Sequence, residues 1–338
     1  MNKGHTYPVI VLMAVLLLAS CGGKGGRWSD KAHQQEAAGQ EADLQFRSLN
    51  LSKGPEVPSV ITDRKEISEY IVSHFWDAFF DGEYACDSSH INGVSSDEVE
   101  KAIGMFVTLL ENNCPREFSE KAMSGFFSKV EHFSKEHPET NVYSFFEKEV
   151  PKYLYDPNSP VRDEDLYRPY ASGLASSDLT DENMKAAYAF DAEMSALNKV
   201  GSVVSDFTFT DLGGKRHSLH GIKADYTLLM FTNPGCDNCK ETIRSLVANT
   251  RITQLVKSGA IVVANVYIDL EREKWQELAK EYPSEWLNGY DQDYAIRQDR
   301  SYNVRGIPSL YVLDSNKRVV MKDAPLEKVI PLLMNIQT

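Results

Sequence analysis

Two cysteines, separated by two residues, stand between an apolar run and a segment with helical spacing. The stretch NPGCDNCKE, Asn233–Glu241, directly follows the run YTLLMF at Tyr226–Phe231. A second apolar run, IVVANVYI at Ile261–Ile268, comes after the helical segment. Short apolar runs are typical of strands buried on both faces, and the order strand, helix, strand predicts a right-handed parallel crossover. The sequence therefore predicts an α/β domain with the two cysteines at the end of a central strand.

Other segments extend this domain to about residues 200–338. The stretch Asp206–Leu219 alternates apolar and polar residues around Gly213-Gly214 and predicts a β-hairpin. The remaining expected elements are a helix over Glu271–Glu281, a strand over Ser309–Leu313, its hairpin partner Arg318–Met321, and a terminal helix from Leu326.

The place of the cysteines favours a reactive dithiol. Cys236 is expected at the exposed start of the helix and Cys239 one turn later on the same face, close enough to form a disulfide. Backbone N–H groups and the helix dipole stabilise an anion there, which predicts Cys236 as the attacking nucleophile and Cys239 as the resolving cysteine. Asp237 lies between them, and its negative charge should partly offset the dipole.

Two other uses of the cysteine pair are disfavoured. A structural zinc site needs four ligands, and neither a second CxxC motif nor a paired histidine motif accompanies this one. His217 and His220 are expected to face solvent on the hairpin. A purely structural disulfide would close too short a loop to stabilise the fold much. We therefore expect neither a metal nor an organic cofactor.

Residues 58–199 repeat apolar side chains at helical spacing and predict an all-α domain. Asp63 suits the N-cap of its first helix, with Glu66 as a capping-box partner. Further helices are expected around Val99–Leu110, Phe118–Phe133 and Asp181–Lys199, and the proline-marked stretch Val150–Tyr170 is expected to be irregular.

Several residues of the helical region have ambiguous roles. The sequence leaves open whether Cys86 and Cys114 form a disulfide or remain two buried thiols. His132 and His137 are five residues apart, whereas two ligands on one helical face lie four apart, so we expect solvated histidines.

The beginning of the chain indicates export and lipid anchoring. Residues 1–20 combine Lys3 with an apolar run too short to span a bilayer, which is typical of a signal peptide. The stretch Leu18-Ala19-Ser20-Cys21 resembles the lipobox of bacterial lipoproteins, which implies that Cys21 carries the lipid. Residues 21–57 are polar and rich in Gly, Gln and Ala, and predict a flexible tether.

The expected location is therefore the cell envelope, with a lipid anchor and the folded part outside the cytoplasm, on the periplasmic side. Thiols in that compartment are exposed to oxidising chemistry. The formal net charge of -13 disfavours nucleic acid as a partner, because phosphates would repel the protein.

Three features together resemble a known family. The hairpin DFTFTDLGGKRHSL, the junction of strand, CxxC and helix, and Ile307-Pro308 before SLYVLD are similar to the thioredoxin-like redoxin domain of membrane-anchored thiol-disulfide oxidoreductases. The resemblance implies a thioredoxin-like α/β fold preceded by the all-α domain. It further implies that Pro308 follows a cis peptide bond, faces the dithiol and forms a substrate platform with Ile307.

The helical region also resembles a known domain. Its segment VPKYLYDPNSPVRDEDLY is similar to a domain of unassigned function that precedes redoxin domains in some bacterial lipoproteins, and no chemistry follows from this.

The chain departs from the thioredoxin pattern at three positions. Gly235 replaces the usual aromatic residue before the first cysteine, and Met230 stands where a buried acid is usual. Asp269, after the next strand, is the alternative candidate for proton handling, although a capped loop acid is the simpler interpretation. Asn233 replaces the threonine that the peroxidase branch needs three residues before Cys236, which disfavours peroxidase activity.

The sequence thus favours a thiol-disulfide oxidoreductase that acts on cysteine-containing envelope proteins and receives electrons from an upstream donor. One alternative is a non-catalytic lipoprotein whose helical domain docks a partner and whose dithiol is regulatory. A thiol peroxidase is the less favoured alternative.

Overall fold

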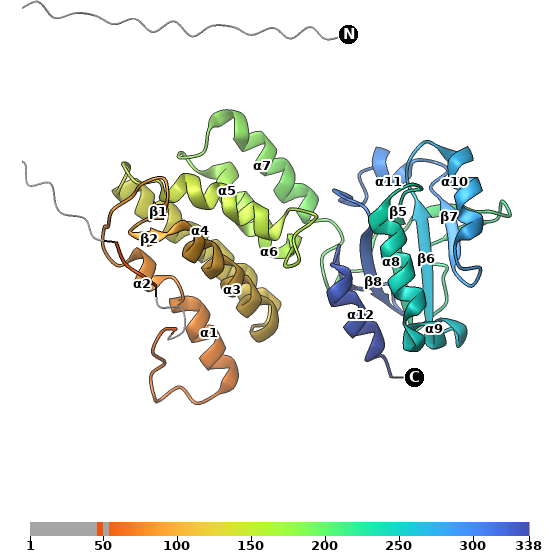
Figure 1. Cartoon of the computed structure of the whole chain (residues 1–338), viewed down its shortest axis with the longest axis horizontal. Helices are drawn as coiled ribbons and strands as arrows, with labels where there is room; N and C mark the ends of the chain where they lie inside the picture. The colour runs from red at the N-terminus through yellow and green to blue at the C-terminus, as the bar shows by residue number, and fades with distance from the viewer. Residues whose placement is uncertain (1–45, 50–53, 338) are drawn as a thin grey trace, which may run out of the picture. The chain divides into compact units, whose positions relative to one another are not determined.

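The computed structural model describes residues 46–49 and 54–337, in which a helical domain precedes a sheet domain (Figure 1). The predicted signal peptide, Cys21 and most of the predicted tether lie outside these residues. Within the described ranges, no helix is both long enough and apolar enough to cross a membrane.

The helical domain contains seven of the described helices and a short hairpin (Figure 1). The elements are α1 (Arg64–His74), α2 (Asp77–Phe80), β1 (His90–Ile91), β2 (Val94–Ser95), α3 (Ser96–Asn113), α4 (Arg116–Glu136), α5 (Val142–Leu154), α6 (Glu164–Ser176) and α7 (Glu182–Ser195).

The predicted helix starts follow from capping chemistry. The Asp63 carboxylate accepts hydrogen bonds from the backbone N–H groups of Lys65 and Glu66, as the sequence predicts for an N-cap. Asp181 caps α7 in the same way through the N–H of Asn183. Pro115 precedes α4, at a position where a backbone N–H would have no helical acceptor. The missing N–H of proline therefore costs no helical hydrogen bond.

An aromatic cluster forms the centre of this domain. The Trp76 ring stacks on Phe126 at 4.8 Å between centroids and meets Phe79, Phe106 and Phe146 edge-on at 5.4–5.9 Å. Each aromatic pair of this kind adds about 0.5–1.5 kcal/mol beyond the area that it buries. The aromatic residues at helical spacing therefore form a structural core.

The prediction of an irregular stretch over residues 150–170 is wrong at both ends. Helix α5 includes Pro151 and continues to Leu154, and α6 begins at Glu164 and includes Pro169. Each proline removes one backbone N–H donor from its helix. The buried apolar faces of both helices offset that loss, and only the turn over residues 155–163 remains irregular.

The predicted tether ends earlier than residue 57. The Arg47 guanidinium donates hydrogen bonds to the carbonyl oxygens of Ala78 and Phe79, each at 2.5 Å. These carbonyls lie at the end of α2, where helical partners are missing, so an arginine satisfies them. The Leu49 N–H donates to the Glu98 carboxylate at 2.8 Å. Residues 46–49 therefore pack against the helical domain.

The sheet domain has nine elements up to β7 and four after it. They are β3 (Thr208–Asp211), β4 (Arg216–Ser218), β5 (Tyr226–Thr232), α8 (Asp237–Ala248), α9 (Thr250–Lys257), β6 (Ile261–Tyr267), α10 (Arg272–Leu278), the 3₁₀ turn η1 (Ala279–Glu281), β7 (Leu287–Tyr290), α11 (Ala295–Gln298), β8 (Ser309–Asp314), β9 (Val319–Met321) and α12 (Leu326–Met334).

The strand order β4-β3-β7-β6-β5-β8-β9 places β5 and β6 at the centre of a mixed sheet. Strands β5, β6 and β7 are parallel, whereas β8 is antiparallel to β5. The parallel pairing of β5 and β6 confirms the predicted crossover. The sheet and its helices form the predicted thioredoxin-like fold.

The two faces of the sheet are buried in different ways, because successive side chains of a strand point to opposite sides. Leu228 and Met230 of β5 belong to a cluster with residues of α8, α9 and α12. Leu229 and Phe231 belong to a cluster with the β3 region and residues near α11. Strand β5 is therefore buried on both faces.

Strand β7 is an element that the sequence analysis missed. Its short run, LNGY, contains asparagine and glycine, which weaken a strand pattern. A Cβ atom on Gly289 would lie 2.4 Å from the Phe209 ring and 3.0 Å from the Thr210 carbonyl oxygen. The glycine is thus explained by the close approach of β3, which only tertiary structure reveals.

The contact between α4 and α6 leads to a stability prediction. A Cβ atom on Gly173 would lie 2.3 Å from the Phe127 ring, whereas one on Gly125 would meet no atom within 4 Å. Both glycines lie in helices, so replacing either one by alanine raises the helix propensity by a similar amount. In urea unfolding, we expect Gly173→Ala to be about 1–3 kcal/mol less stable than Gly125→Ala. Equal stability of the two variants would contradict the close packing.

Candidate functional site

Strand pairing brings the CxxC motif and the proline loop together. Phe231, near the end of β5, pairs with Ser309 at the start of antiparallel β8. The segment after β5 therefore lies beside the segment before β8. The first contains Cys236 and the second contains Ile307 and Pro308, joined by a cis peptide bond as the resemblance implies. The Ile307 carbonyl oxygen lies 3.8 Å from Cys236 Sγ.

The two cysteines occupy the start of α8. Cys236 is the N-cap residue, and its sulfur accepts a hydrogen bond from the Cys239 backbone N–H at 3.1 Å. The pair forms a disulfide, with 5.2 Å between the Cα atoms. Cys236 is half-buried and Cys239 is 2% exposed. An attacking reagent therefore reaches Cys236 more readily than Cys239.

The residue before the first cysteine has a backbone reason to be glycine. Gly235 has a φ of 86°, in the left-handed region that side chains rarely adopt. An aromatic residue, usual in thioredoxins, would be strained at this position. The turn between β5 and α8 thus explains one departure from the family pattern.

Below this turn, the structure has a series of buried polar side chains joined by hydrogen bonds, which the sequence does not predict. Thr232 and Asn265 bond through their side chains at 2.5 Å, and the Asn265 amide donates to Asn288 at 3.1 Å. All three are buried on β5, β6 and β7. Met230, at the position of the usual acid, is fully buried among apolar residues. Asn265, inside the apolar run Ile261–Ile268, is the sequence signal for these buried hydrogen bonds.

The acidic candidates near the dithiol have other partners. Asp269 forms an ion pair with Arg297 at 2.5 Å and accepts a hydrogen bond from the Asn233 amide. This is the capped loop acid that the sequence analysis considered. The Asp237 side chain is 94% exposed and pairs with Lys240 at 3.3 Å, so solvent screens most of its effect on the thiolate.

A cavity of about 190 Å³ borders the dithiol. Both cysteines line it, together with Ile243 of α8, Leu278 of α10 and Tyr282. Its wall is therefore partly apolar and lies on the side of the dithiol formed by α8 and α10.

Buried charges surround the loop before Pro308. Arg305 Nε donates to the Glu164 carboxylate at 2.8 Å, and the Arg305 guanidinium also bonds to Asp323 at 2.8 Å. Lys322 pairs with Glu164 at 2.9 Å. Burial raises the pKa of both Glu164 and Asp323, and the neighbouring cations oppose that rise. The sequence does not predict a role for these residues, because they are far apart in the chain.

The two histidines predicted on the hairpin, His217 and His220, each have a protein partner. His217 Nε2 lies 2.7 Å from the Asp211 carboxylate, and His220 Nε2 lies 2.8 Å from the Val204 carbonyl oxygen. Both are half-buried, so the expectation that they face solvent is wrong. His132 is exposed, as expected for a solvated histidine, and pairs with Glu136 at 3.4 Å.

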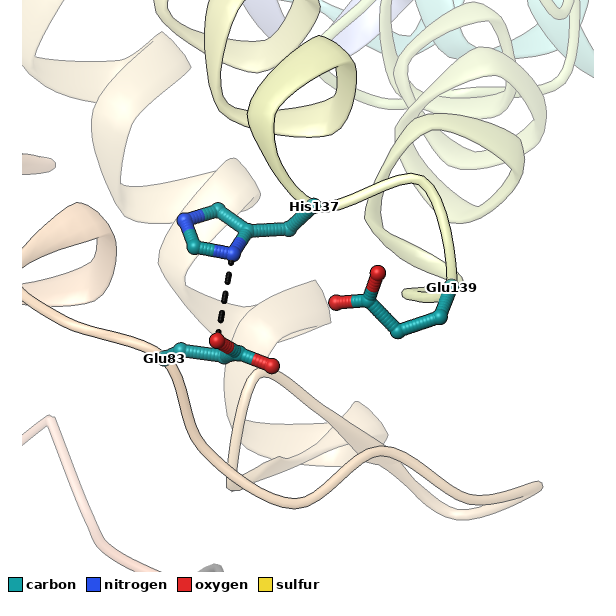
Figure 2. Close-up of side chains that lie close together, drawn as sticks. All are labelled: Glu83, His137 and Glu139. Atoms are coloured by element: carbon teal, nitrogen blue, oxygen red, sulfur yellow. Dashed lines mark ion pairs between the residues drawn. The ribbon is translucent and has the colours of Figure 1, made fainter.

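One group in the described part of the chain has the composition of a metal site. Glu83, His137 and Glu139 lie close together in the helical domain, as Figure 2 shows. His137 Nδ1 forms an ion pair with Glu83 at 3.3 Å. Both glutamates are exposed, and the ion pair accounts for the position of Glu83 beside the histidine.

The other two described cysteines are free thiols. Cys86 and Cys114 are both half-buried and form no disulfide. Burial raises the pKa of the Cys114 thiol, which reduces its thiolate fraction at neutral pH. The disulfide-bonded pair, Cys236 and Cys239, is therefore distinct from the cysteines of the helical domain.

The sheet order, the disulfide at the start of α8 and the cis peptide bond before Pro308 define a thioredoxin-like protein. The family described as "Domain of unknown function (DUF5106)" matches residues 21–198, which is more than half of the chain. The chain therefore belongs to the DUF5106 family, here joined to a thioredoxin-like domain.

Solved structures are similar to this chain over different lengths. A thioredoxin-like protein from Bacteroides caccae is 32% identical, with a TM-score of 0.71, and the match covers 84% of this chain and 98% of that chain. The C-terminal domain of an uncharacterized protein from Bacteroides fragilis is 38% identical over 40% of this chain and 97% of that chain, with a TM-score of 0.39.

The thioredoxin domain of a thiol-disulfide oxidoreductase from Bacteroides vulgatus is 25% identical over 40% of this chain and 99% of that chain, with a TM-score of 0.36. None of the curated proteins matches this chain.

The tyrosine beside Arg305 leads to a prediction about pH. Burial raises the pKa of Tyr155 to about 12. A tyrosine with a raised pKa stabilises the fold below its ordinary pKa of about 10, and this contribution is lost as the pH rises toward the folded-state value. In urea unfolding, we expect the stability of the wild type to fall more steeply between about pH 10 and 12 than that of Tyr155→Phe. Parallel curves would contradict the burial of this hydroxyl.

Proposed function

We propose that this protein is a thiol-disulfide oxidoreductase of the cell envelope, which exchanges the Cys236–Cys239 disulfide with cysteines of partner proteins. The observation that carries the proposal is the position of Cys236. Its sulfur is the N-cap of α8 and lies 3.8 Å from the carbonyl oxygen that precedes the cis-proline. A nucleophilic sulfur thus stands beside the backbone carbonyl of the half-buried residue Ile307.

The first step begins from the reduced dithiol. The Cys239 N–H and the α8 dipole stabilise negative charge on Cys236 Sγ, which favours the thiolate. This thiolate attacks one sulfur of a partner disulfide. An S–S bond forms between Cys236 and the partner, the partner disulfide breaks, and the other partner sulfur leaves as a thiolate that takes up a proton.

The second step releases the partner. Cys239 loses its proton and attacks Cys236 Sγ, which closes the Cys236–Cys239 disulfide and expels the second partner sulfur as a thiolate. Two electrons pass from the protein to the partner. The same steps in reverse oxidise a partner dithiol, so the direction depends on the relative reduction potentials.

Cys239 needs a proton acceptor in this second step. Met230 offers none, and Asp269 is already bonded to Arg297 and Asn233. The cavity lined by Cys239 gives water a route to the thiol, so water is the proposed acceptor. A dithiol protein acting as upstream donor returns the electrons, and no organic cofactor is required.

The roles of the two cysteines predict an asymmetry in trapping. Without Cys239, the mixed disulfide formed by Cys236 has no internal resolving thiol. We expect Cys239→Ser to accumulate about tenfold more reductant-sensitive adducts with envelope proteins than Cys236→Ser does. Non-reducing gel electrophoresis after acid quenching measures the adducts, and mass spectrometry identifies the partners.

The matched control is the double variant Cys236→Ser and Cys239→Ser, which should form no adducts at this site. Equal trapping by the two single variants would overturn the assigned roles. A protein that neither traps partners nor reduces insulin disulfides would instead support the alternative, a docking protein with a regulatory dithiol.

Lipid anchoring at Cys21 is the second part of the proposal, and it rests on the sequence Leu18-Ala19-Ser20-Cys21. We expect wild-type protein to incorporate labelled fatty acid in bacterial cells and Cys21→Ala to lose nearly all of the label. Cys86→Ala is the control, because it removes another cysteine and should keep the label. Labelled Cys21→Ala would exclude this attachment site.

A further inference from the structure

The turn between α5 and α6 contacts the loop that precedes the cis-proline. A Cβ atom on Gly306 would lie 2.7 Å from Cβ and 3.2 Å from Cγ of Pro157. The ring of Pro157 therefore occupies the space that a side chain at position 306 would need. Gly306 adjoins Ile307, whose carbonyl oxygen faces Cys236. The contact thus lies next to the backbone edge proposed to receive a substrate.

Arg305, one residue earlier, binds into the helical domain. Its guanidinium donates to Glu164 and lies 4.1 Å from the centre of the Tyr155 ring. The Glu164 carboxylate also accepts from the Asn303 amide at 2.9 Å. The Glu164 side chain is 1% exposed, so water cannot replace these partners. Lys322 is a second cation at Glu164, and removing either cation from a buried carboxylate is destabilising, which restricts Arg305 to this position.

The other side of the cis peptide bond is held by the same network. Ser309, directly after Pro308, donates to the Asp323 carboxylate at 2.6 Å, and that carboxylate also binds Arg305. Arg162 of the α5–α6 turn donates to the Asp323 carbonyl oxygen at 2.7 Å. Residues on both sides of Pro308 are therefore joined through Asp323 to each other and to the helical domain.

We infer that the α5–α6 turn positions the cis-proline loop for polypeptide substrates, and that Pro157 and Arg305 are the residues through which it does so. The inference rests on the proposed function and names the part of the helical domain that serves it. The ligand class is an extended polypeptide carrying a disulfide, because a backbone carbonyl, that of Ile307, lies 3.8 Å from Cys236 Sγ. A small reductant has no backbone to place against Ile307 and does not need this loop.

A substitution at Gly306 tests the inference. Gly306→Ala introduces the methyl group that Pro157 excludes, so the loop must move relative to Cys236. A misplacement of about 1 Å near a reacting centre costs up to about 100-fold in rate, and we expect a rise of about tenfold in the KM for insulin. The rate at which dithiothreitol reduces the Cys236–Cys239 disulfide should remain within about twofold of the wild type.

Two further variants separate positioning from general damage. Pro157→Gly removes both opposing ring atoms, so the double variant Gly306→Ala with Pro157→Gly should recover most of the insulin KM lost in Gly306→Ala. Gly125→Ala adds a methyl group to an exposed helical position with no neighbour within 4 Å, and it should match the wild type. Thermal melts of every variant show whether the fold is retained.

The outcomes distinguish this inference from the proposed function. Wild-type protein that leaves insulin oxidised contradicts the proposed function and, with it, the inference. Active wild-type protein with an unchanged KM in Gly306→Ala contradicts the inference alone. An equal slowing of insulin and dithiothreitol reactions, or a double variant as impaired as Gly306→Ala, also overturns it.

Discussion

The antiparallel pairing of β5 with β8 is the constraint on which the site depends. It places the end of one strand beside the start of the other, with Phe231 opposite Ser309. The turn after β5 can then end in Cys236, and the loop before β8 can end in Pro308. Because β5 is buried on both faces and paired on both edges, this geometry belongs to the most constrained part of the sheet.

Helix α8, which follows β5, supplies the other part of the site. Cys236 caps α8 with a sulfur atom, so the group that ends the backbone turn is also the group that we propose carries charge during exchange. Gly235 allows that turn with its positive φ. The buried Thr232, Asn265 and Asn288 bond across three strands just before the turn, which fixes its base without an ionisable group. The base of the turn is therefore built from neutral hydrogen-bonding groups.

The parts of the fold that sequence predicts well are those with a local signal. The runs at Tyr226–Phe231 and Ile261–Ile268 are apolar along their whole length, and the cysteine spacing places the dithiol between them. Strand β7 has no such signal, because Gly289 is selected by the approach of Phe209. Helices α5 and α6 contain prolines that predict loops, and only the packing of their buried faces shows why they persist.

The charge network could not be predicted for a related reason. Glu164 and Arg305 are separated by 141 residues. Each is a charged residue, and in the sequence alone each looks like an ordinary surface residue. The cis-proline itself was accessible only through the family resemblance of Ile307-Pro308. Local pattern thus predicts the dithiol, whereas the surroundings of the proline loop depend on contacts between the two domains.

Those contacts also bear on how such a chain can change during evolution. Breaking a buried ion pair by removing one partner costs about 3–5 kcal/mol, whereas replacing all partners together can be neutral. Glu164 and Asp165 of the helical domain both pair with Lys322, and Glu164 also pairs with Arg305. Recombination that exchanged one domain alone would leave these charges buried without partners. The helical and thioredoxin-like domains are therefore expected to be inherited as a matched pair, with substitutions at their shared charges occurring together.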